Sequence, residues 1–491
     1  MKDTGSLINH YCERFTLIDE KEAPKLMTIE HELKTSTAVP KCGLMMIGLG
    51  GNNGTTVTCG ILANKNKLSW LTRRGEASAN YFGSFSQSVT VKVGMRQSKD
   101  PSGKKTMEDI YKPVKDLLPM VKPEDFVIGG WDINSMDMYN ATLRAKVLEP
   151  GLIQQLEKDL IKMKPLPGVY NLAYIASNQE DRANHIKEGT TSQLIQQVQE
   201  DIKNFRTTNK LERVVVLWTA NTERYYEKDI SNLEELEKLI KENAPLPPSV
   251  VYGVAALREK AIFLNGSPQN TIHPALIELA HKQGSYLAGS DFKSGQTKYK
   301  TAMGDYLIGS GIPIRSIVSY NHLGNNDGKN LSEPHTFRSK ELSKVSCLED
   351  AIMSNKILYP KGQEHIDHTV VIKYCPFVGD SKRAMDEYTS EIFLQGTNTI
   401  VSYNVCEDSL LAAPIMIDIC VFAELFSRIS IDSKPMGPVL SYLSFFFKAP
   451  VTNHPEYVIN SLGRQKDMLS NFLKACAGYG TEDNTMMAFD F

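Results

Sequence analysis

The chain lacks a strong net charge. Its 55 basic residues nearly balance 57 acidic ones, so the formal net charge is −2 over 491 residues. Proteins that attract nucleic acid or an anionic membrane through a broad field carry an excess of positive charge. The balance therefore predicts neither partner. Hydrophobic residues at 41% and charged residues at 23% are ordinary for a globular protein, and the length indicates two or three domains.

Paired cysteines and a secretory leader are also missing. The eight cysteines stand singly, with no C-x-x-C pair. The first residues, Met1-Lys2-Asp3-Thr4, lack the apolar segment of a signal peptide. Isolated cysteines in a chain of this length favour reduced thiols. These absences predict a cytoplasmic protein.

Long apolar runs and metal-ligand clusters are scarce as well. The longest apolar run, residues 412–426, is interrupted by Asp418 and Glu424 and is too short to span a bilayer. We therefore expect a buried core helix there and no membrane partner. His365 and His368 have no acid or cysteine nearby that completes a metal site, so no metal is predicted.

A strand, a glycine cluster and a helix follow one another from residue 42. Residues 44–47 form a short apolar run typical of a buried parallel strand, and a G-x-G-G-x-x-G loop ending at Gly54 comes next. Helical spacing begins at Val57. Backbone N–H groups at such a helix start can hold a pyrophosphate. However, the loop is one residue longer than the usual fingerprint, and no well-placed acid follows about 20 positions on. The residues alone leave dinucleotide binding and a tight structural turn both open.

Strand and helix patterns alternate over residues 42–290. Apolar runs at 126–132, 170–176 and 213–218 predict strands. Apolar positions with helical spacing at 152–160 and 194–205 predict helices. Ser231 and Glu234 match a capping box before a further helix. This alternation is typical of a doubly wound parallel sheet, which makes the expected class α/β.

Two polar stretches follow predicted strands or loops and suit ligand binding. Asp132 ends a strand and would lie at the crevice of an open sheet, or it caps the helix that follows. The Ser-Gly-Gln-Thr sequence at 294–297 begins a predicted helix and is either an anion cradle or an ordinary N-cap.

The second half concentrates amides and lysines. Residues 319–328 are unusually rich in amide and acidic side chains for a segment that follows a predicted strand. The alternative to a functional role is an ordinary hairpin turn at 326–328. Lys382 follows a predicted helix start at 379–381, and Lys448 follows three phenylalanines. An apolar setting lowers the pKa of a lysine and suits it to proton transfer.

At these residues the sequence resembles the myo-inositol-phosphate synthase family. The matching text covers nearly the whole chain from residue 42, and it resembles the eukaryotic branch. The longest matches read GLGGNNGTT, VLWTANTERY, NGSPQNT, SDFKSGQTK, SYNHLGNNDGKNLS, FRSKE, VGDSKRAMDEY, NVCEDSLLAAP and FFFKAP. The longer glycine loop is the family's own variant.

The resemblance implies a Rossmann-type doubly wound parallel sheet plus an α+β catalytic and tetramerisation domain. By this resemblance, residues 42–297 form the NAD-binding domain and residues 298–411 the catalytic domain. Residues 1–41 and 412–491 jointly form a central domain. The assembly implied is a homotetramer.

The resemblance also implies site residues. The cofactor NAD would be bound by Gly51, Asn52, Asn53, Gly54, Asp132, Thr219, Ala220, Asn221 and Thr222, and at its nicotinamide end by Asp291, Gly379, Asp380 and Asp408. The substrate would be bound by Ser294, Gly295, Gln296, Thr297, Asn321 and Lys344. The catalytic residues would be Lys340, Lys382, Lys448, Asp408, Asn325 and Asp327.

The implied reaction is the NAD-dependent isomerisation of D-glucose 6-phosphate to 1D-myo-inositol 3-phosphate, a step of inositol and phospholipid biosynthesis. It comprises C5 oxidation, enolisation, intramolecular aldol cyclisation and re-reduction, with no net redox change. We expect Lys340 to take the C5 hydroxyl proton, while Lys382 and Lys448 stabilise oxyanions at C5 and C1.

Two other classes of function compete with this reading. An ordinary NAD dehydrogenase would release NADH in step with product. A non-enzymatic nucleotide or sugar-phosphate sensor on a Rossmann scaffold would bind NAD and give no product. The dense lysine set argues against the sensor, because one phosphate needs only one or two cations.

Overall fold

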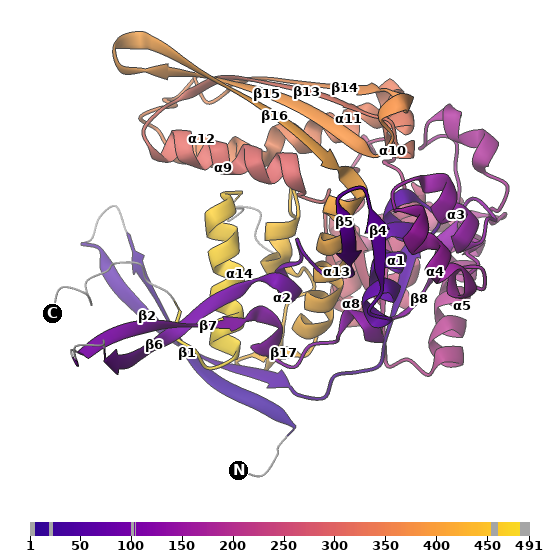
Figure 1. Cartoon of the computed structure of the whole chain (residues 1–491), viewed down its shortest axis with the longest axis horizontal. Helices are drawn as coiled ribbons and strands as arrows, with labels where there is room; N and C mark the ends of the chain where they lie inside the picture. The colour runs from indigo at the N-terminus through magenta and orange to yellow at the C-terminus, as the bar shows by residue number, and fades with distance from the viewer. Residues whose placement is uncertain (1–4, 19–22, 100–102, 104, 453–459, 482–491) are drawn as a thin grey trace.

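Three large sheets organise the protein, and two small hairpins extend from them (Figure 1). The computed structural model describes residues 5–18, 23–99, 103, 105–452 and 460–481. The sheets have six, four and four strands, and each hairpin has two.

The six-stranded sheet is parallel throughout and has the order β12-β11-β10-β3-β8-β9. Its strands are β3 (Cys42–Ile47), β8 (Val127–Asp132), β9 (Leu166–Pro167), β10 (Arg213–Trp218), β11 (Ile262–Asn265) and β12 (Leu287–Ala288). The order reverses between β3 and β10, which is the switch point of a doubly wound fold. The predicted fold class and the strands at 44–47, 126–132 and 213–218 are confirmed.

Helices cover both faces of this sheet because successive side chains of a strand point to opposite faces. On β3, Leu44 and Met46 join one apolar core, and Met45 and Ile47 join the other. The first core includes α1 (Asn52–Lys65), α3 (Met138–Ala145), α4 (Pro150–Leu160) and α13 (Asp408–Phe426). The second includes α5 (Thr191–Asn209), α6 (Leu233–Lys241), α7 (Pro248–Arg258) and α8 (Pro274–Gln283).

The helix α13 is the central element of the first core. Among the described residues it is the one helix long and apolar enough to cross a membrane, but 83% of its apolar window is buried inside the protein. The carboxylate of Asp418, at its middle, accepts hydrogen bonds from Ser84 Oγ at 2.6 Å and Ser86 N at 2.8 Å. The helix therefore belongs to the core, as the sequence predicts.

A mixed sheet with the order β14-β13-β15-β16 forms the second unit. Its strands are β13 (Ile314–Leu323), β14 (Asp367–Tyr374), β15 (Ser381–Ile392) and β16 (Gly396–Glu407). Helices α9 (Gly295–Gly309), α11 (Pro334–Val345) and α12 (Glu349–Ser354) lie against one face. Figure 1 shows no helix on the other face. The short helix α10 (Asn326–Asn330) follows β13 toward the parallel sheet.

Both ends of the chain contribute to the third sheet, which has the order β1-β2-β17-β18. Its strands are β1 (Ser6–Leu17), β2 (Lys25–Ser36), β17 (Ile429–Ile431) and β18 (Lys434–Pro435), and α14 (Leu462–Cys476) packs against β1 and β2. The predicted domain boundaries at 41, 297 and 411 stay predictions.

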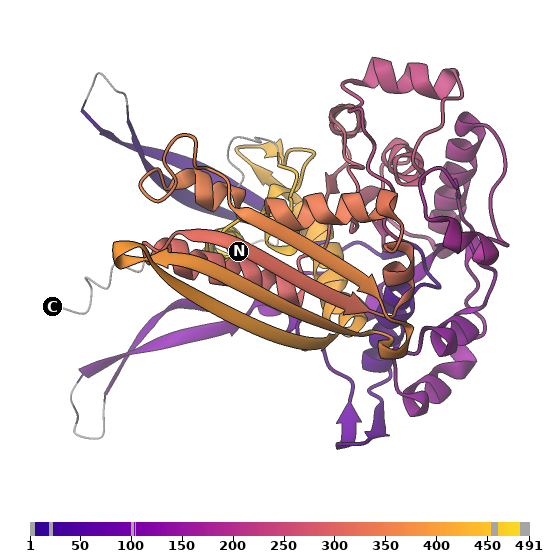
Figure 2. The same ribbon diagram turned by 90° about the horizontal axis from the view of Figure 1, so that it is seen from above.

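Two hairpins lie between α1 and β8. They are β4 (Ser69–Thr72) with β5 (Gly75–Ser78), and β6 (Thr90–Lys99) with β7 (Lys105–Pro113), which flank the short α2 (Phe85–Ser88). In Figure 2 the β1–β2 and β6–β7 hairpins extend to the same side, away from the helices of the parallel sheet.

Three local predictions are wrong. Residues 170–176 form turns rather than a strand, and a 3₁₀ helix follows at Ser177–Arg182. At the end of the segment, Ala176 N donates to Asn330 Oδ1 of α10 at 3.2 Å rather than to a neighbouring strand. Residues 379–381 begin no helix, because Ser381 opens β15. Residues 326–328 start α10 instead of a hairpin turn.

The capping box at Ser231 and Glu234 is also wrong, by one residue. Asn232 caps α6, and its side chain accepts from Glu235 N at 2.9 Å. The Glu235 carboxylate accepts from Ser231 N at 3.0 Å. Since Glu235 bonds to the residue before the N-cap and not to Asn232 itself, the helix has an N-cap but not the reciprocal bonds of a capping box.

Candidate active site

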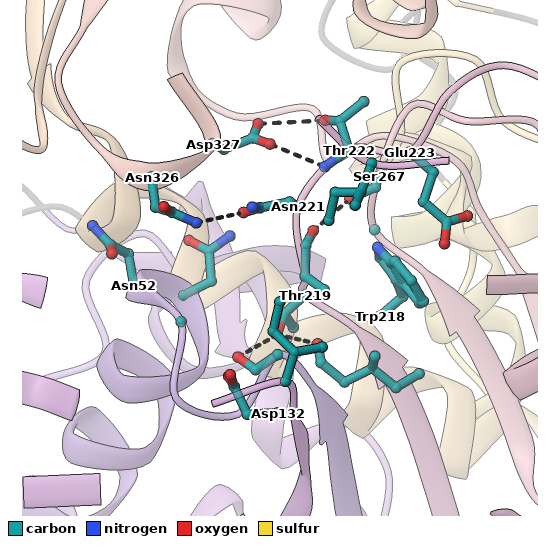
Figure 3. A pocket seen from close by; sticks show the side chains of 18 of the residues that line it. Asn52, Asp132, Trp218, Thr219, Asn221, Thr222, Glu223, Ser267, Asn326 and Asp327 are labelled. Carbon is teal, nitrogen blue, oxygen red and sulfur yellow. Dashed lines mark hydrogen bonds between the residues drawn. The ribbon is translucent and has the colours of Figure 1, made fainter. Parts of the chain in front are cut away.

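A polar cleft lies at the carboxyl ends of β3, β8 and β10, where the sheet order reverses. It encloses about 1310 Å³ of space, open solvent included, and the second sheet's α10 and α11 close its other side. Figure 3 shows Asp132 at the opposite side of the lining from Asp327. Ligands of open α/β sheets bind at this position.

The glycine loop forms the floor of the cleft. Gly48 has φ +85°, and a Cβ there would lie 2.8 Å from Ala220 Cα. Gly51 is the N-cap of α1, and Gly51, Asn52 and Asn53 line the cleft. Gly54 lies behind the loop, where a Cβ would meet Leu49 O at 2.3 Å. The loop therefore brings the N-terminus of α1 to the cleft at the closeness that a pyrophosphate requires.

Asp132 faces the cleft and does not cap the helix that follows, because Asp137 caps α3. The Asp132 carboxylate accepts from Gly50 N at 2.9 Å and Asn134 N at 3.0 Å. Burial raises the pKa of Asp132, against the attraction of Arg182. The carboxylate thus ties the glycine loop to the end of β8.

Residues 219–222 line the wall beside β10. Thr219 Oγ1 donates to Ile47 O at 2.9 Å, which joins the ends of β10 and β3. Asn326 Nδ2 donates to Asn221 Oδ1 at 3.2 Å, and Thr222 N donates to Asp327 Oδ1 at 3.0 Å (Figure 3). These bonds fasten α10 over the parallel sheet, so Asn325 and Asp327 face the same cleft as the glycine loop.

Asp291 holds two lysines, one from α11 and one from the C-terminal part of the chain. Its carboxylate lies 3.1 Å from Lys340 Nζ and 2.7 Å from Lys448 Nζ. Burial alone would raise the pKa of Asp291, but these lysines hold it at about 2. Burial lowers the pKa of Lys448 to about 8, despite Asp291. The pKa of Lys340 is raised, because Asp291 and Asp327 outweigh its burial.

A second pair of a lysine and a carboxylate also lines the cleft. Lys382 Nζ donates to Asp408 Oδ1 at 3.3 Å, and both residues line the cleft. Asp380 accepts from Ser409 N and Ser409 Oγ, each at 2.8 Å. It also accepts at 3.4 Å from the side chains of Asn52 and Asn325. Burial and the neighbouring Asp408 raise the pKa of Asp380 to about 6. Asp380 and Gly379 stand behind the lining rather than in it.

The predicted substrate-binding residues divide into two groups. Ser294 is the N-cap of α9, makes no side-chain capping bond and lines the cleft. Lys344 Nζ donates to Gln296 Oε1 and to Asn321 Oδ1, both at 3.1 Å. Lys344 is buried together with these two amides, behind the lining that Lys382 and Lys448 form. Gly295 and Thr297 lie in the first turn of α9 and are not part of the lining either.

Several cleft residues escaped prediction from the sequence. They are Asn326, Ser409, Arg182 and Glu223. Asn326 and Ser409 lie next to predicted site residues in the chain, and this adjacency is the one feature of the sequence that could have indicated them. Arg182 and Glu223 gave no such signal, since single charged residues in polar segments are common. Burial raises the pKa of Glu223 to about 8, although Ser249 donates to both of its carboxylate oxygens.

The arrangement combines an anion-binding helix start with a cluster of ammonium groups. Lys340, Lys382 and Lys448 line one cleft with the glycine loop, and the carboxylates of buried Asp291 and half-buried Asp408 hold them in place. Such groups can stabilise negative charge that develops on sugar oxygens, and an amine with a lowered pKa can exchange protons near neutral pH.

Comparisons with known proteins agree on one family. Residues 42–474 match the family model described as myo-inositol-1-phosphate synthase. The chain is 50% identical to inositol-3-phosphate synthase 1 of Oryza sativa subsp. japonica and to probable inositol 3-phosphate synthase isozyme 3 of Arabidopsis thaliana. Each match covers 95% of this chain and 91% of the relative.

A solved structure gives the same result. The crystal structure of inositol-3-phosphate synthase from Caenorhabditis elegans matches with a TM-score of 0.95 and 42% identity. The match covers 100% of this chain and 97% of that one.

Proposed function

This chain belongs to the myo-inositol-1-phosphate synthase family, and from this premise we propose how its cleft converts D-glucose 6-phosphate to 1D-myo-inositol 3-phosphate. The protein is an NAD-dependent isomerase, an inositol-3-phosphate synthase of inositol biosynthesis. The observation that carries the residue roles is the meeting of the glycine loop and three lysines in one cleft.

The residues present fit NAD. A Cβ at Gly48 or Gly54 would strike backbone atoms, so the loop keeps the closeness that a pyrophosphate needs. Gly51, Asn52 and Asn53 would hold the pyrophosphate, Asp132 the adenosine side, and residues 219–222 the wall of the crevice. Bound there, NAD would accept a hydride from C5 and later return it, so the reaction has no net redox change.

Lys340 is the proposed base for the C5 hydroxyl proton, with Asp291 holding its amine in place. Because the pKa of Lys340 is raised, its amine is protonated in the free protein, so this role requires that Lys340 first gives up a proton. A C5 ketone makes the C6 hydrogens acidic, and an enolate can then form. Lys382, held at 3.3 Å by Asp408, and Lys448, held at 2.7 Å by Asp291, would stabilise the oxyanions at C5 and C1. Asn325 and Asp327 would orient the sugar from α10. Burial and the packing of α10 over the cleft keep these charges away from bulk water, which strengthens their effect.

The substrate phosphate would be held by residues 294–297 and Lys344. The N-terminus of α9 offers backbone N–H groups, and Lys344 offers a donor behind them. Asp380, Gly379 and Asp408 would flank the nicotinamide end.

We further propose that the enzyme is a cytoplasmic homotetramer without nucleic-acid or membrane partners. The near-neutral charge supports the absence of such partners. The exposed apolar face of the second sheet supports self-association, since Val401, Tyr403 and Val405 are 56%, 67% and 50% exposed there.

The decisive experiment is incubation with glucose 6-phosphate and a catalytic amount of NAD, followed by identification of the product. We expect inositol phosphate in excess over NAD, with no lasting rise in NADH absorbance. NADH released in proportion to product would identify a dehydrogenase, and NAD binding without any product would identify a sensor.

A further inference from the structure

A layer of buried polar side chains lies between α9, α11 and the second sheet. Its members are Gln296 and Lys300 from α9, Lys344 from α11, Ser319 and Asn321 from β13, His368 from β14, and Asp386 from β15. Lys300 Nζ lies 2.5 Å from Ser319 Oγ and 2.9 Å from His368 Nε2. Asp386 is the one carboxylate among these residues, and it is 2% exposed.

Asp386 contacts Gln296 with both of its oxygens. Gln296 Nε2 donates to Oδ1 at 3.0 Å and to Oδ2 at 3.1 Å. The remaining contact is long: Tyr388 Oη lies 3.5 Å from Oδ2. Among the described residues no Lys, Arg or His nitrogen forms an ion pair with this carboxylate. Its principal partner is therefore one amide group.

An ionised carboxylate only accepts hydrogen bonds. The Gln296 amide must therefore turn its NH₂ group to Asp386, which leaves its carbonyl oxygen for Lys344. The opposite orientation would place a second donor against an ammonium group and an acceptor against a carboxylate. Asp386 thus determines which atom of Gln296 meets Lys344.

Lys344 retains one donor. An ammonium group has three N–H bonds, and within the described part of the chain Lys344 donates to Gln296 Oε1 and Asn321 Oδ1 alone. Burial, with Lys382, Lys300 and Lys448 nearby, lowers the pKa of Lys344 well below its ordinary value, so the ammonium form with three N–H bonds is the form that a bound anion would favour. An anion would relieve this crowding of positive charge, and the third N–H is the bond available to it.

We propose that Asp386 is a positioning residue, which orients Gln296 so that Lys344 presents its third N–H to the phosphate group of the substrate. This role rests on the proposed function, because it takes the phosphate ester as the ligand of Lys344. Asp386 is not among the residues that line the cleft, and it acts through Gln296.

The test variant is Asp386→Asn, which keeps the shape of the side chain and removes its charge. An asparagine both donates and accepts, so the Gln296 amide is free to turn. We expect the KM for glucose 6-phosphate to rise roughly tenfold, equivalent to about 1.4 kcal/mol, with a much smaller change in kcat. Asp386→Glu keeps an acceptor-only group and should restore part of the affinity.

Two further variants separate positioning from a general structural effect. Tyr388→Phe removes the other contact of the same carboxylate and should leave the KM unchanged. In a Lys344→Met background, Asp386→Asn should add little to the KM, because the residue through which it acts is gone. If Asp386→Asn does not fold, Gln296→Leu breaks the same link from α9 and should raise the KM at least as much, because Gln296 is itself a proposed phosphate-binding residue.

The outcomes distinguish this inference from the proposed function. If the parent enzyme makes inositol phosphate and Asp386→Asn has the parent's KM, Asp386 has no positioning role. An equal loss in the presence and absence of Lys344 would also overturn it. If the parent forms no cyclised product, the proposed function itself fails.

Discussion

Lys448 is a buried amine among other cations. It shares Asp291 with Lys340, and burial lowers its pKa to about 8. An amine in this state is protonated at neutral pH and loses its proton only slightly above it. Whether it serves as an ammonium group is therefore visible in the pH dependence of catalysis.

If the Lys448 ammonium stabilises an oxyanion, kcat/KM should fall as the pH rises above about 8, because this ratio reports the free enzyme. Lys448→Met should lower turnover by roughly 10²–10³-fold, as loss of one oxyanion donor does, and should remove that alkaline limb. Rates of inositol phosphate formation between pH 6 and 10, at roughly unit steps, test both effects.

The exposed Lys356 provides a matched control for this change. Lys356→Met should keep the parent's rate and pH profile. Turnover of Lys448→Met within a factor of about two of the parent would exclude the role, since one oxyanion donor is worth far more.

Glu223 is a fully buried carboxyl group with its pKa raised to about 8, against 4.5 when unperturbed. Between these values the folded protein keeps a proton that the unfolded chain releases. This contribution to stability is complete below about pH 4.5 and is lost as the pH rises toward 8. The slope is up to about 1.4 kcal/mol per pH unit.

Glu223→Gln removes the titrating group, so the difference in unfolding free energy between variant and parent should grow in favour of the variant from about pH 5 to pH 8. Denaturant titrations at several pH values measure this difference. Glu227→Gln, an exposed change nearby, should show no such trend. A difference that stays constant with pH would mean that Glu223 is ionised throughout.

At the scale of single elements, two glycines of α1 differ in the room that they leave for a side chain. A Cβ at Gly54 would lie 2.3 Å from Leu49 O and 2.6 Å from Gly48 O. At Gly60, two turns further along the same helix, nothing lies within 4 Å of a Cβ. The same substitution therefore has opposite consequences at the two positions.

Gly54→Ala should push the glycine loop out of place, with a loss of about 1–3 kcal/mol in stability. NAD affinity should fall at least tenfold, or about 1.4 kcal/mol. Gly60→Ala should bind NAD as the parent does and gain roughly 0.5–1 kcal/mol, because alanine is the better helix former. Calorimetric titration with NAD and thermal unfolding provide both readouts. Equal behaviour of the two variants would contradict the steric account of the loop.

Strands with a continuous run of apolar residues were predictable from the sequence. The strands at 44–47, 126–132 and 213–218 are confirmed because they are central strands, buried on both faces. Residues 170–176 look similar but form turns, and Ala176 N bonds to Asn330 of α10, which lies about 150 positions later in the chain. Local pattern cannot show such a partner.

The candidate site was predictable where a motif carries its own chemistry, as in the glycine loop and the lysine-bearing segments. The sequence could not show that Lys344 and Gln296 stand behind the cleft lining, or that Asp386 contacts Gln296 and Gln296 contacts Lys344, because these contacts join three separate elements. Asp386 lies in β15, where buried and exposed side chains alternate. This alternation indicates that Asp386 points inward, but it does not indicate which residue it contacts.

At the scale of the whole molecule, the outer face of the second sheet carries exposed apolar side chains that the proposed active site does not explain. Register places Tyr320 beside Met385 and Met385 beside Tyr403, so one row crosses β13, β15 and β16. These side chains are 46%, 48% and 67% exposed. In Figure 1 no other element covers that face. A row of this kind is typical of an interface between protein chains.

If this face joins subunits of the proposed homotetramer, Tyr403→Asp should convert the protein to a smaller species, because a buried unpaired carboxylate in the interface is costly. Sedimentation equilibrium or light scattering at several concentrations measures the mass. Ile357→Asp, at a site that is 92% exposed in the same unit, makes the same kind of change away from the row and should leave the mass unaltered. NAD binding to the smaller species should persist, since the glycine loop belongs to the other sheet. A Tyr403→Asp protein with the parent's mass at all concentrations would show that this face does not join the subunits, and a parent that is already monomeric would exclude the tetramer.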